Sequence, residues 1–412
     1  MCSSDLGTTF GREGVRFAEV IGTAGVELQF DMYLRDPAED GAPLELSIDI
    51  SVQAAMRRVL AGGMAMMNAK GAAAVLMEVD TGQVISLVSL PDFDPNHRPA
   101  PPVKGDPADS PLFNRVAQGK YELGSTFKLF TAALAMESGT ATLDTMVPTR
   151  GPLRWGKYTI RDFHDYGSQL SLMDVIVKSS NIGTANLAVE MGAEAQQGFL
   201  RKLGFFDPVP LEIKEVQRSK PLLPPKWSEL STMTISYGHG LAATPLHLAA
   251  AYATLTNGGL KVTPTLLKVG AIPTEVDRVI SPQTSANLRN MLRQVVVRGT
   301  ASLGEVEGYQ VGGKTGTADK PNPQGGYYED KVIATFVSVF PMNNPKYVLV
   351  VSLDEPEERS GSEPRRTAGW TAVPVGAEII RRIAPLMGMR PEHFDDRRSE
   401  EHTSELQSHP NL

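Results

Sequence analysis

The chain has 412 residues, of which 41% are hydrophobic and 21% charged, a composition typical of globular proteins and not of disordered chains. Its 40 basic and 47 acidic residues give a net charge of -7, without a basic run of the kind that follows a phosphate backbone, so nucleic acid is not expected as a partner. No stretch approaches the ~18 uninterrupted apolar residues that a membrane-spanning helix needs.

Both ends of the chain look foreign to the rest of the sequence. Residues 398–412 are polar and lack periodicity, and they resemble translated sequencing-adapter DNA, as do residues 1–6. We therefore expect both segments to be non-native and the chain to be a piece of a longer one. The single cysteine, Cys2, lies in the first of these segments, so no disulfide is expected.

Hydrophobic periodicity and turn signals predict the elements in chain order. A charged stretch at residues 35–43 contains Gly and Pro and predicts a boundary, after which a main domain is expected over residues 44–391. Helices are predicted over residues 52–67, 125–137, 245–256 and 373–387, with two more between residues 170 and 191. Strands are predicted over residues 72–79, 84–88, 309–311, 332–340 and 347–353. Because the strands flank a mostly helical middle third, we expect an α+β fold around one antiparallel sheet.

Ser125 and Lys128 lie one turn apart on a predicted helix, which puts both side chains on one face. A serine needs a base to act as a nucleophile, and a lysine is a base only if burial or a nearby cation lowers its pKa. Lys314 is the candidate for that cation. Backbone N–H groups at the start of the helix are suited to hold an oxyanion. The pair therefore indicates acyl transfer, although a Ser-x-x-Lys pair alone is more often a surface contact.

Two Ser-x-Asn sequences are candidates for the second part of such a site. Ser179 and Asn181 lie between two apolar helical stretches, whereas Ser285 and Asn287 lie among arginines in a stretch typical of a solvated helix face. We therefore favour Ser179 and Asn181. The third part is Lys314-Thr315-Gly316-Thr317, which predicts an edge strand that a substrate backbone can approach. A glycine-rich turn is the alternative interpretation of this stretch.

The three motifs together resemble those of a known superfamily. Their order, with 54 residues from Ser125 to Ser179 and 133 from Asn181 to Lys314, matches the Ser-x-x-Lys, Ser-x-Asn and Lys-Thr-Gly set of penicillin-binding proteins and serine β-lactamases. Further stretches are similar to class B penicillin-binding proteins, at residues 121–128, 178–184, 236–246, 313–318 and 354–356. Within that class the division-specific peptidoglycan D,D-transpeptidases are most similar, and the elongation type is the nearest alternative.

The resemblance implies a β-lactamase/transpeptidase-like fold, in which helices flank an antiparallel sheet beside an all-helical subdomain. It also implies that residues 7–43 are the remnant of an N-terminal pedestal domain and that residues 44–391 form the penicillin-binding transpeptidase domain. The implied activity is the cross-linking of peptidoglycan stem peptides ending in D-Ala-D-Ala during septal cell-wall synthesis.

The resemblance also implies a role for each site residue. Ser125 is expected to be the nucleophile, acylated by substrate or by a β-lactam after Lys128 removes its proton. Ser179 is expected to relay a proton to the leaving amine, and Asn181 to orient Lys128 and the substrate amide. The substrate is expected to bind along an edge made by Lys314, Thr315, Gly316 and Thr317. The backbone N–H groups of Ser125 and Thr317 are the expected oxyanion hole.

The resemblance implies no cofactor and no metal. The expected partners are peptidoglycan stem peptides, lipid-linked or on nascent glycan strands, together with β-lactam antibiotics and divisome membrane proteins. The catalytic domain is expected in the bacterial periplasm, held at the inner membrane by an anchor that this fragment lacks.

Other functions fit the sequence less well. A β-lactam sensor or a serine β-lactamase of the same fold are the alternatives, but the Glu-x-x-x-Asn stretch of class A β-lactamases does not occur between residues 181 and 314. The chain has no His-Glu-x-x-His, Gly-x-Ser-x-Gly or phosphate-binding glycine motif. For His239 a structural role is favoured over contact with substrate, and the three tryptophans, Trp155, Trp227 and Trp370, are expected to be packing residues.

Overall fold

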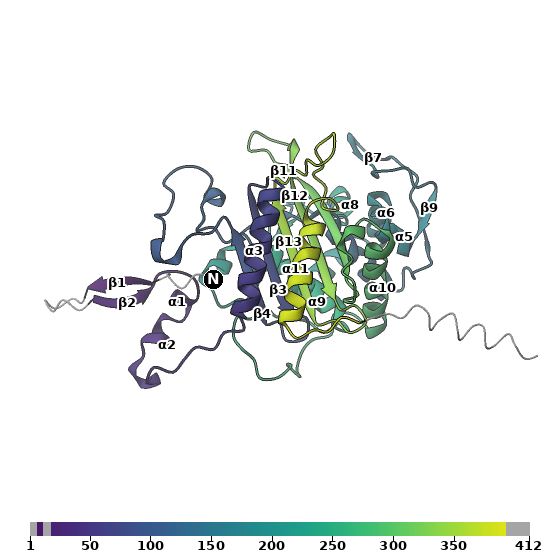
Figure 1. The fold of residues 1–412 in the computed structure, drawn as a ribbon. Coiled ribbons are helices and arrows are strands. Elements are labelled where there is room, and N and C mark those ends of the chain that lie inside the picture. The colour runs from purple at the N-terminus through teal and green to yellow at the C-terminus, as the bar shows by residue number, and fades with distance from the viewer. Residues whose placement is uncertain (1–5, 11–17, 393–412) are drawn as a thin grey trace, which may run out of the picture.

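A computed structural model describes residues 6–10 and 18–392 of the chain (Figure 1). The segment at residues 398–412 and nearly all of residues 1–6, which we expect to be non-native, lie outside the described residues, as does Cys2. Within the described part, no helix has the length and apolar character needed to cross a membrane.

A five-stranded antiparallel sheet forms the centre of the molecule, in the order β11-β12-β13-β3-β4. Its strands are β3 (Gly71–Glu78), β4 (Val84–Leu90), β11 (Gly312–Pro321), β12 (Tyr327–Phe340) and β13 (Tyr347–Asp354). Because β13 pairs with β3, the sheet joins two parts of the chain that are far apart in sequence. The predicted antiparallel sheet and its first hairpin are confirmed.

The strand predicted over residues 309–311 is wrong, because β11 begins at Gly312. Gly308 and Gln310 have φ values of 83° and 43°, and the carbonyl oxygen of Gln310 accepts a hydrogen bond of 2.9 Å from Met342 N. Left-handed backbone at these positions turns the chain and cannot continue an extended strand. The two glycines that begin β11 are therefore inside the strand, not in a turn.

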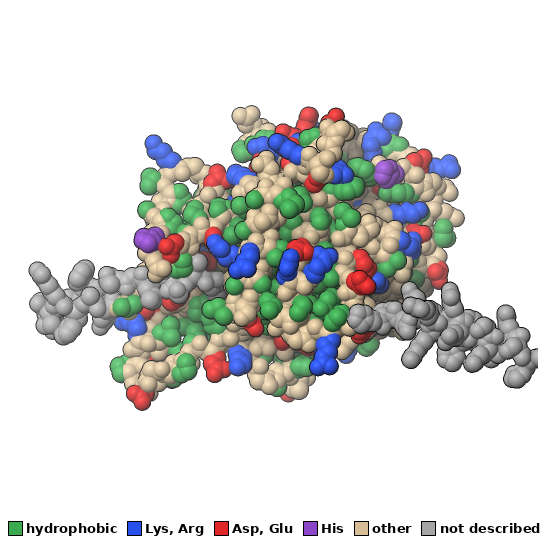
Figure 2. Space-filling model, viewed as in Figure 1, with side chains coloured by type: hydrophobic (Ala, Val, Ile, Leu, Met, Phe, Trp, Pro, Cys, Tyr) green, Lys and Arg blue, Asp and Glu red, His purple; other side chains and the backbone are tan. Residues whose placement is uncertain are grey.

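Helices cover both faces of the sheet (Figure 1). α3 (Ile50–Met66) and α11 (Ala372–Leu386) pack side by side against one face, and α9 (Pro245–Thr256) packs against the other. Because both faces are covered, β3 and β13 are buried along nearly their whole length and have continuous apolar sequences. The outward surface of α3 and α11 mixes charged and apolar side chains (Figure 2).

A mostly helical subdomain lies between the two halves of the sheet in sequence. Its helices are α4 (Lys128–Glu137), α5 (Leu172–Val177), α6 (Asn181–Met191), α7 (Ala193–Lys202), α8 (Glu229–Ile235) and α10 (Pro282–Arg298). Three short antiparallel pairs accompany them: β5 (Tyr121–Glu122) with β10 (Ala242–Ala243), β6 (Met146–Pro148) with β9 (Gln169–Ser171), and β7 (Leu153–Trp155) with β8 (Tyr158–Ile160). The α+β class is confirmed, and the subdomain contains strands that we did not expect.

The N-terminal part is small. β1 (Leu6–Phe10) pairs with β2 (Ala18–Gly22), and α1 (Gly25–Gln29) and α2 (Asp31–Arg35) follow. The remaining elements are short 3₁₀ helices: η1 (Pro37–Glu39), η2 (Pro95–His97), η3 (Pro107–Asp109), η4 (Gly124–Phe127), η5 (Lys214–Arg218) and η6 (Ser302–Gly304). The domain boundary near residue 43 stays a prediction.

Two predictions about side chains are wrong. Ser285 is fully buried in α10, where its hydroxyl accepts a hydrogen bond of 3.0 Å from Gly258 N, so it does not lie on a solvated helix face. Trp155 and Trp370 are 40% and 45% exposed, so neither is a packing residue of the core. Trp227 is partly buried and donates to Gln196 Oε1, as expected of a packing residue.

Arg115 ties the irregular segment before the helical subdomain to the sheet. Its side chain is nearly fully buried, and its guanidinium donates to Asp354 Oδ2 and to the carbonyl oxygens of Leu90 and Ala108, each over 2.9 Å. These bonds connect Leu90, at the end of β4, and Ala108, in the irregular segment, to Asp354 at the end of β13. A buried charge with this many partners is costly to remove, because the partners are left unsatisfied.

Replacing Arg115 with Met is therefore expected to lower the free energy of unfolding by about 3 kcal/mol. The control is Arg359→Met, because Arg359 forms an exposed ion pair with Glu357 and its loss is expected to cost about 0.5 kcal/mol. Urea unfolding measures both values. Equal losses in the two variants would contradict a tethering role for Arg115.

Candidate active site

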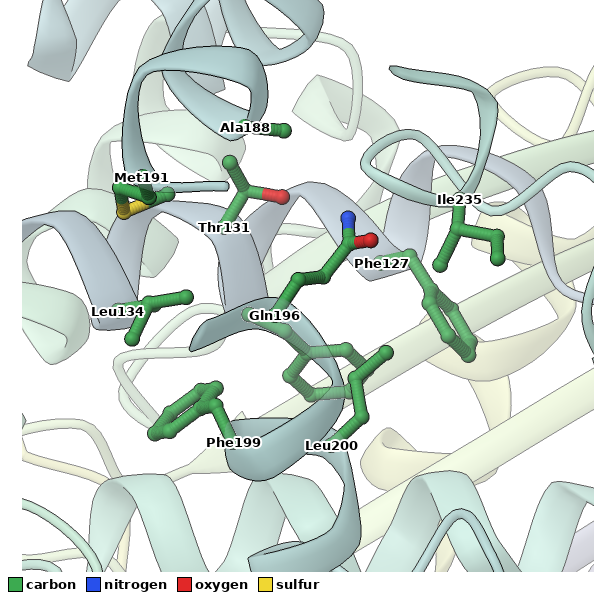
Figure 3. Close-up of a pocket in the computed structure, with 10 residues that line it drawn as sticks. Phe127, Thr131, Leu134, Ala188, Met191, Gln196, Phe199, Leu200 and Ile235 are labelled. Atoms are coloured by element: carbon green, nitrogen blue, oxygen red, sulfur yellow. The ribbon is translucent and has the colours of Figure 1, made fainter. Parts of the chain in front are cut away.

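Ser125 lies on a tight turn whose other side is packed into the core. The predicted helix begins as the 3₁₀ turn η4 and continues as α4. The ring of Phe127 packs against those of Phe130 and Phe205, with centroids 5.0 and 4.9 Å apart. Figure 3 shows Phe127 with side chains of α4, α6, α7 and α8 around a small, mostly apolar space. This packing fixes the turn and leaves Ser125 on the side of the open cavity.

Glycines let two other segments approach the turn closely. A Cβ atom on Gly316, in β11, would lie 2.2 Å from the carbonyl oxygen of Leu123. A Cβ atom on Gly238 would lie 2.0 Å from the carbonyl oxygen of Gly124, and Gly124 N donates to Gly238 O over 3.2 Å. Only a residue without a side chain fits at either contact. The Lys-Thr-Gly strand and the loop at residues 237–240 are thereby held against the turn that carries Ser125.

Two buried lysines meet at one hydroxyl. Lys128 Nζ and Lys314 Nζ each donate a hydrogen bond of 3.0 Å to Ser179 Oγ, and both side chains are fully buried. Lys128 also donates to the carbonyl oxygen of Ser179 over 2.5 Å, and Lys314 to that of Thr315 over 3.1 Å. The structure thus brings one residue from each of the three predicted motifs into direct contact.

The environment of the two lysines changes their basicity. Burial, and next the repulsion from Lys314, lower the pKa of Lys128 well below its usual range, although Asp162 opposes this. Burial lowers the pKa of Lys314 to about 7. Because a lowered pKa means that the proton leaves at lower pH, both shifts favour the neutral amine, which is the form that a general base needs.

Ser179 and Asn181 flank the start of α6. Ser179 has a φ of 62°, a left-handed conformation that is uncommon for a residue with a side chain and is often found at functional sites. It turns the Ser179 hydroxyl toward both amines. The amide nitrogen of Asn181, which we expected to orient Lys128, donates to the carbonyl oxygen of Arg161 over 2.9 Å. In the structure, the Asn181 amide therefore connects the start of α6 to the segment that contains Arg161.

Ser125 lines a cavity of about 640 Å³ together with Ser179, Asn181 and the Lys-Thr-Gly strand. Among the described residues its hydroxyl has no hydrogen-bond partner, so the predicted contact with Lys128 is not formed in this state. Bonds of this kind often tighten only when substrate binds. Thr315 Oγ1 lies 2.6 Å from Thr300 Oγ1, and Thr317 Oγ1 accepts from Ala368 N over 2.9 Å. The cavity wall at this strand is accordingly lined with hydroxyl groups.

Asp162 is a residue of the site that the sequence did not reveal. Its carboxylate accepts from Ser180 Oγ over 2.6 Å and from Ile182 N over 3.0 Å, which anchors the turn that contains Ser179. It lies 18 residues before Ser180 in sequence, and no motif marks it. Only the folded chain brings it to the turn.

Three exposed rings line the cavity wall. We expected structural roles for two of them, His239 and Trp370, and the sequence did not reveal the third, Phe163. His239 lines the cavity with 42% of its side chain exposed, and Glu122 raises the pKa of its imidazole. Phe163 and Trp370 line the same cavity and are 83% and 45% exposed. Exposed rings beside a cavity are unusual and mark a surface suited to a ligand. Within the described chain, no group of three or more His, Cys, Asp or Glu side chains is placed to hold a metal ion.

Comparison with known proteins gives consistent matches. The family described as penicillin binding protein transpeptidase domain matches residues 72–379. The chain is 37% identical over 380 residues to "Probable peptidoglycan D,D-transpeptidase FtsI" of Caulobacter vibrioides, covering 90% of this chain and 63% of the relative. It is 34% identical over 378 residues to penicillin-binding protein PbpB of Mycolicibacterium smegmatis, covering 87% and 57%. The chain thus spans about three fifths of these relatives' length.

The solved structures agree with the fold. The apo TP domain of Burkholderia pseudomallei penicillin-binding protein 3 superimposes with a TM-score of 0.74 at 32% identity, covering 85% of this chain and 98% of that one. A peptidoglycan glycosyltransferase from Burkholderia ambifaria gives a TM-score of 0.72 at 29% identity, covering 84% and 99%. The predicted transpeptidase-like architecture is confirmed.

The close contact at Gly316 makes a prediction. Because a Cβ atom there would meet the backbone of Leu123 at 2.2 Å, Gly316→Ala is expected to push β11 away from the turn that carries Ser125. A misplacement of about 1 Å near the reacting groups typically lowers the rate about 100-fold. The rate of labelling by a fluorescent penicillin measures the loss.

The matched control is Gly62→Ala, which adds the same methyl group in α3 where nothing lies within 4 Å. It is expected to be labelled at the parent rate. If Gly316→Ala were also labelled at the parent rate, the close approach would have no part in the reaction.

Proposed function

Because this chain belongs to the penicillin-binding protein transpeptidase family, of class B, we propose that it is a serine acyl-transferase that cross-links peptidoglycan stem peptides. One observation carries the proposal: Ser179 Oγ is held between two buried lysines beside the cavity that contains Ser125. A nucleophile, a neutral amine and a cation are the three groups that acyl transfer from a carboxylate-bearing peptide requires.

In the first half of the reaction, Lys128 takes the proton of Ser125, and Ser125 Oγ attacks the carbonyl carbon of the penultimate D-Ala. The new C–O bond gives a tetrahedral intermediate, and the collapse of this intermediate breaks the C–N bond to the terminal D-Ala. The backbone N–H groups of Ser125 and Thr317 hold the oxyanion of the intermediate. The proton on Lys128 then passes through Ser179 to the leaving amine. The 3.0 Å bond between these two side chains supports the relay.

The donor peptide lies along β11, and its terminal carboxylate meets Lys314, Thr315 and Thr317. The support is electrostatic, because burial brings the pKa of Lys314 to about 7 and an arriving carboxylate favours its protonated form. Asn181 contacts the substrate amide only if its side chain leaves the carbonyl oxygen of Arg161.

In the second half, an amine of a neighbouring stem peptide attacks the acyl-enzyme. Lys128 takes a proton from the attacking amine and passes it to Ser125 Oγ as the C–O bond to Ser125 breaks, which restores the free serine, and the new amide is the cross-link. Transfer to an amine, and not rapid hydrolysis, is supported by the lack of a Glu-x-x-x-Asn stretch between residues 181 and 314.

We assign this reaction to septal wall synthesis, in the periplasm beside the inner membrane, with β-lactams as inhibitors and divisome membrane proteins as partners. The support is the likeness to a relative named FtsI and the sequence resemblance to division-specific enzymes. A role in elongation is the alternative within the same class.

A labelled penicillin is expected to form one adduct, on Ser125, that persists after free drug is removed. Mass spectrometry of proteolytic peptides locates the adduct, and its decay measures deacylation. Ser125→Ala is expected to abolish labelling.

The matched control for this experiment is Ser302→Ala, a change of another serine in the cavity wall, which is expected to be labelled like the parent. An adduct elsewhere, or labelling of Ser125→Ala, would refute the assigned nucleophile. Fast loss of the adduct would favour a β-lactamase instead.

A further inference from the structure

The segment that carries β7 and β8, residues 150–161, is strongly cationic in an anionic protein. This hairpin segment has four cations and no acidic residue, while the whole chain has a net charge of -7: the cations are Arg150, Arg154, Lys157 and Arg161. All four are exposed, and within residues 6–10 and 18–392 none of them forms a salt bridge. Four unpaired cations this close repel one another, so an anionic ligand would stabilise them.

The nearest acidic side chains are held by other groups. Asp162 accepts hydrogen bonds from Ser180 Oγ and Ile182 N, and Asp165 accepts one from Gly167 N over 2.9 Å. Glu229 accepts from the indole nitrogen of Trp155 over 2.9 Å. These carboxylates fix the shape of the hairpin segment and its neighbours without pairing with its cations.

The hairpin segment is joined directly to the candidate active site. The carbonyl oxygen of Arg161 accepts from Asn181 Nδ2 over 2.9 Å. Ile160, the last residue of β8, is buried in a small cluster with Ile182. Two residues after Arg161, Phe163 enters the cavity wall, and so does Lys178 just before Ser179. The cations therefore lie on a segment that is attached to one wall of the cavity and extends away from it.

The same surface carries exposed aromatic rings. Trp155 is 40% exposed and Tyr158 is 50% exposed, and Phe163, at the cavity end, is 83% exposed. Lys157 Nζ lies 5.5 Å from the centre of the Tyr158 ring. Flat rings beside cations offer both an apolar face for a sugar ring and charges for carboxylates. Figure 1 shows β7 at the upper right edge of the molecule, and Figure 2 shows Lys and Arg side chains in that region.

We propose that the hairpin segment binds the peptidoglycan strand that presents a stem peptide to Ser125, through carboxylates of neighbouring stems and through sugar rings. The proposal rests on the proposed function. A strand carries many stems, each ending in a carboxylate, so the strand that places one stem in the cavity brings other carboxylates and sugars to its rim. Contacts at the rim then add to the binding of the reacting stem, because the second contact is intramolecular.

The test compares two double variants that each remove two exposed cations. Arg154→Gln with Lys157→Gln changes the hairpin tip, which lies outside the cavity wall. Lys202→Gln with Lys220→Gln is the control, because both lysines are exposed and neither lines the cavity. Each is made in the full chain with and without Ser125→Ala, and binding to soluble, uncross-linked peptidoglycan strands is measured by fluorescence anisotropy.

In the Ser125→Ala background, the hairpin variant is expected to have a Kd for the strands about fivefold higher than the parent, a ratio that falls as salt rises, while the control variant is unchanged. With Ser125 present, all forms are expected to be labelled by penicillin at the same rate. A small peptide ending in D-Ala-D-Ala, too short to reach the tip, is expected to bind equally to all forms.

Equal strand Kd values in the hairpin variant and the parent would overturn the proposal, as would loss of penicillin labelling in the hairpin variant. Tighter binding to phosphatidylglycerol vesicles than to strands, lost in the same variant, would overturn it in favour of a membrane contact. Strand binding is measured in the Ser125→Ala background and so does not depend on acylation of Ser125. A failure of Ser125 to be acylated would therefore refute the proposed function and not this inference.

Discussion

The candidate site depends on one hydroxyl group that two buried amines share. Lys128 and Lys314 both donate to Ser179 Oγ over 3.0 Å, and neither is exposed to water. Two ammonium ions this close would repel each other strongly in a medium of low polarity, so the arrangement is stable only if one amine is neutral. Burial lowers the pKa of both amines and thereby favours a base and a cation side by side. Deprotonation of a serine and recognition of a carboxylate need these two groups.

The fold supplies the constraints that keep this costly arrangement in place. The turn that carries Ser125 is fixed on one side by the packing of Phe127, and on the other by the contacts at Gly316 and Gly238. The left-handed conformation of Ser179 persists because Asp162 anchors the residues after it. Strained backbone of this kind requires surroundings that fix it from several sides. The central sheet provides the rigid edge from which Lys314 reaches the other two segments.

The sequence predicted those parts whose signal is local. Buried strands such as β13 and amphipathic helices such as α11 have a clear periodicity, and three short motifs predicted Lys128, Ser179 and Lys314, which the structure brings into contact. Features set by tertiary contact were not predictable. Gln310 ends a predicted strand through a left-handed turn, and Ser285 is buried although its neighbours are charged. The contact of Asp162 with the Ser179 turn joins distant positions with no motif, as does the attachment of the hairpin segment to α6.

The protonation states of the two lysines test the central claim most directly. In protein labelled with ¹³C at the lysine ε-carbons, with signals assigned by Lys128→Met and Lys314→Met, Lys314 is expected to titrate near pH 7, cationic below and neutral above. Lys128 is expected to remain neutral through this range, and its pKa should rise in Lys314→Met, because the repelling cation is gone. If both lysines stayed protonated up to their ordinary pKa of about 10.4, the shared hydroxyl would not create a base and the account would be contradicted.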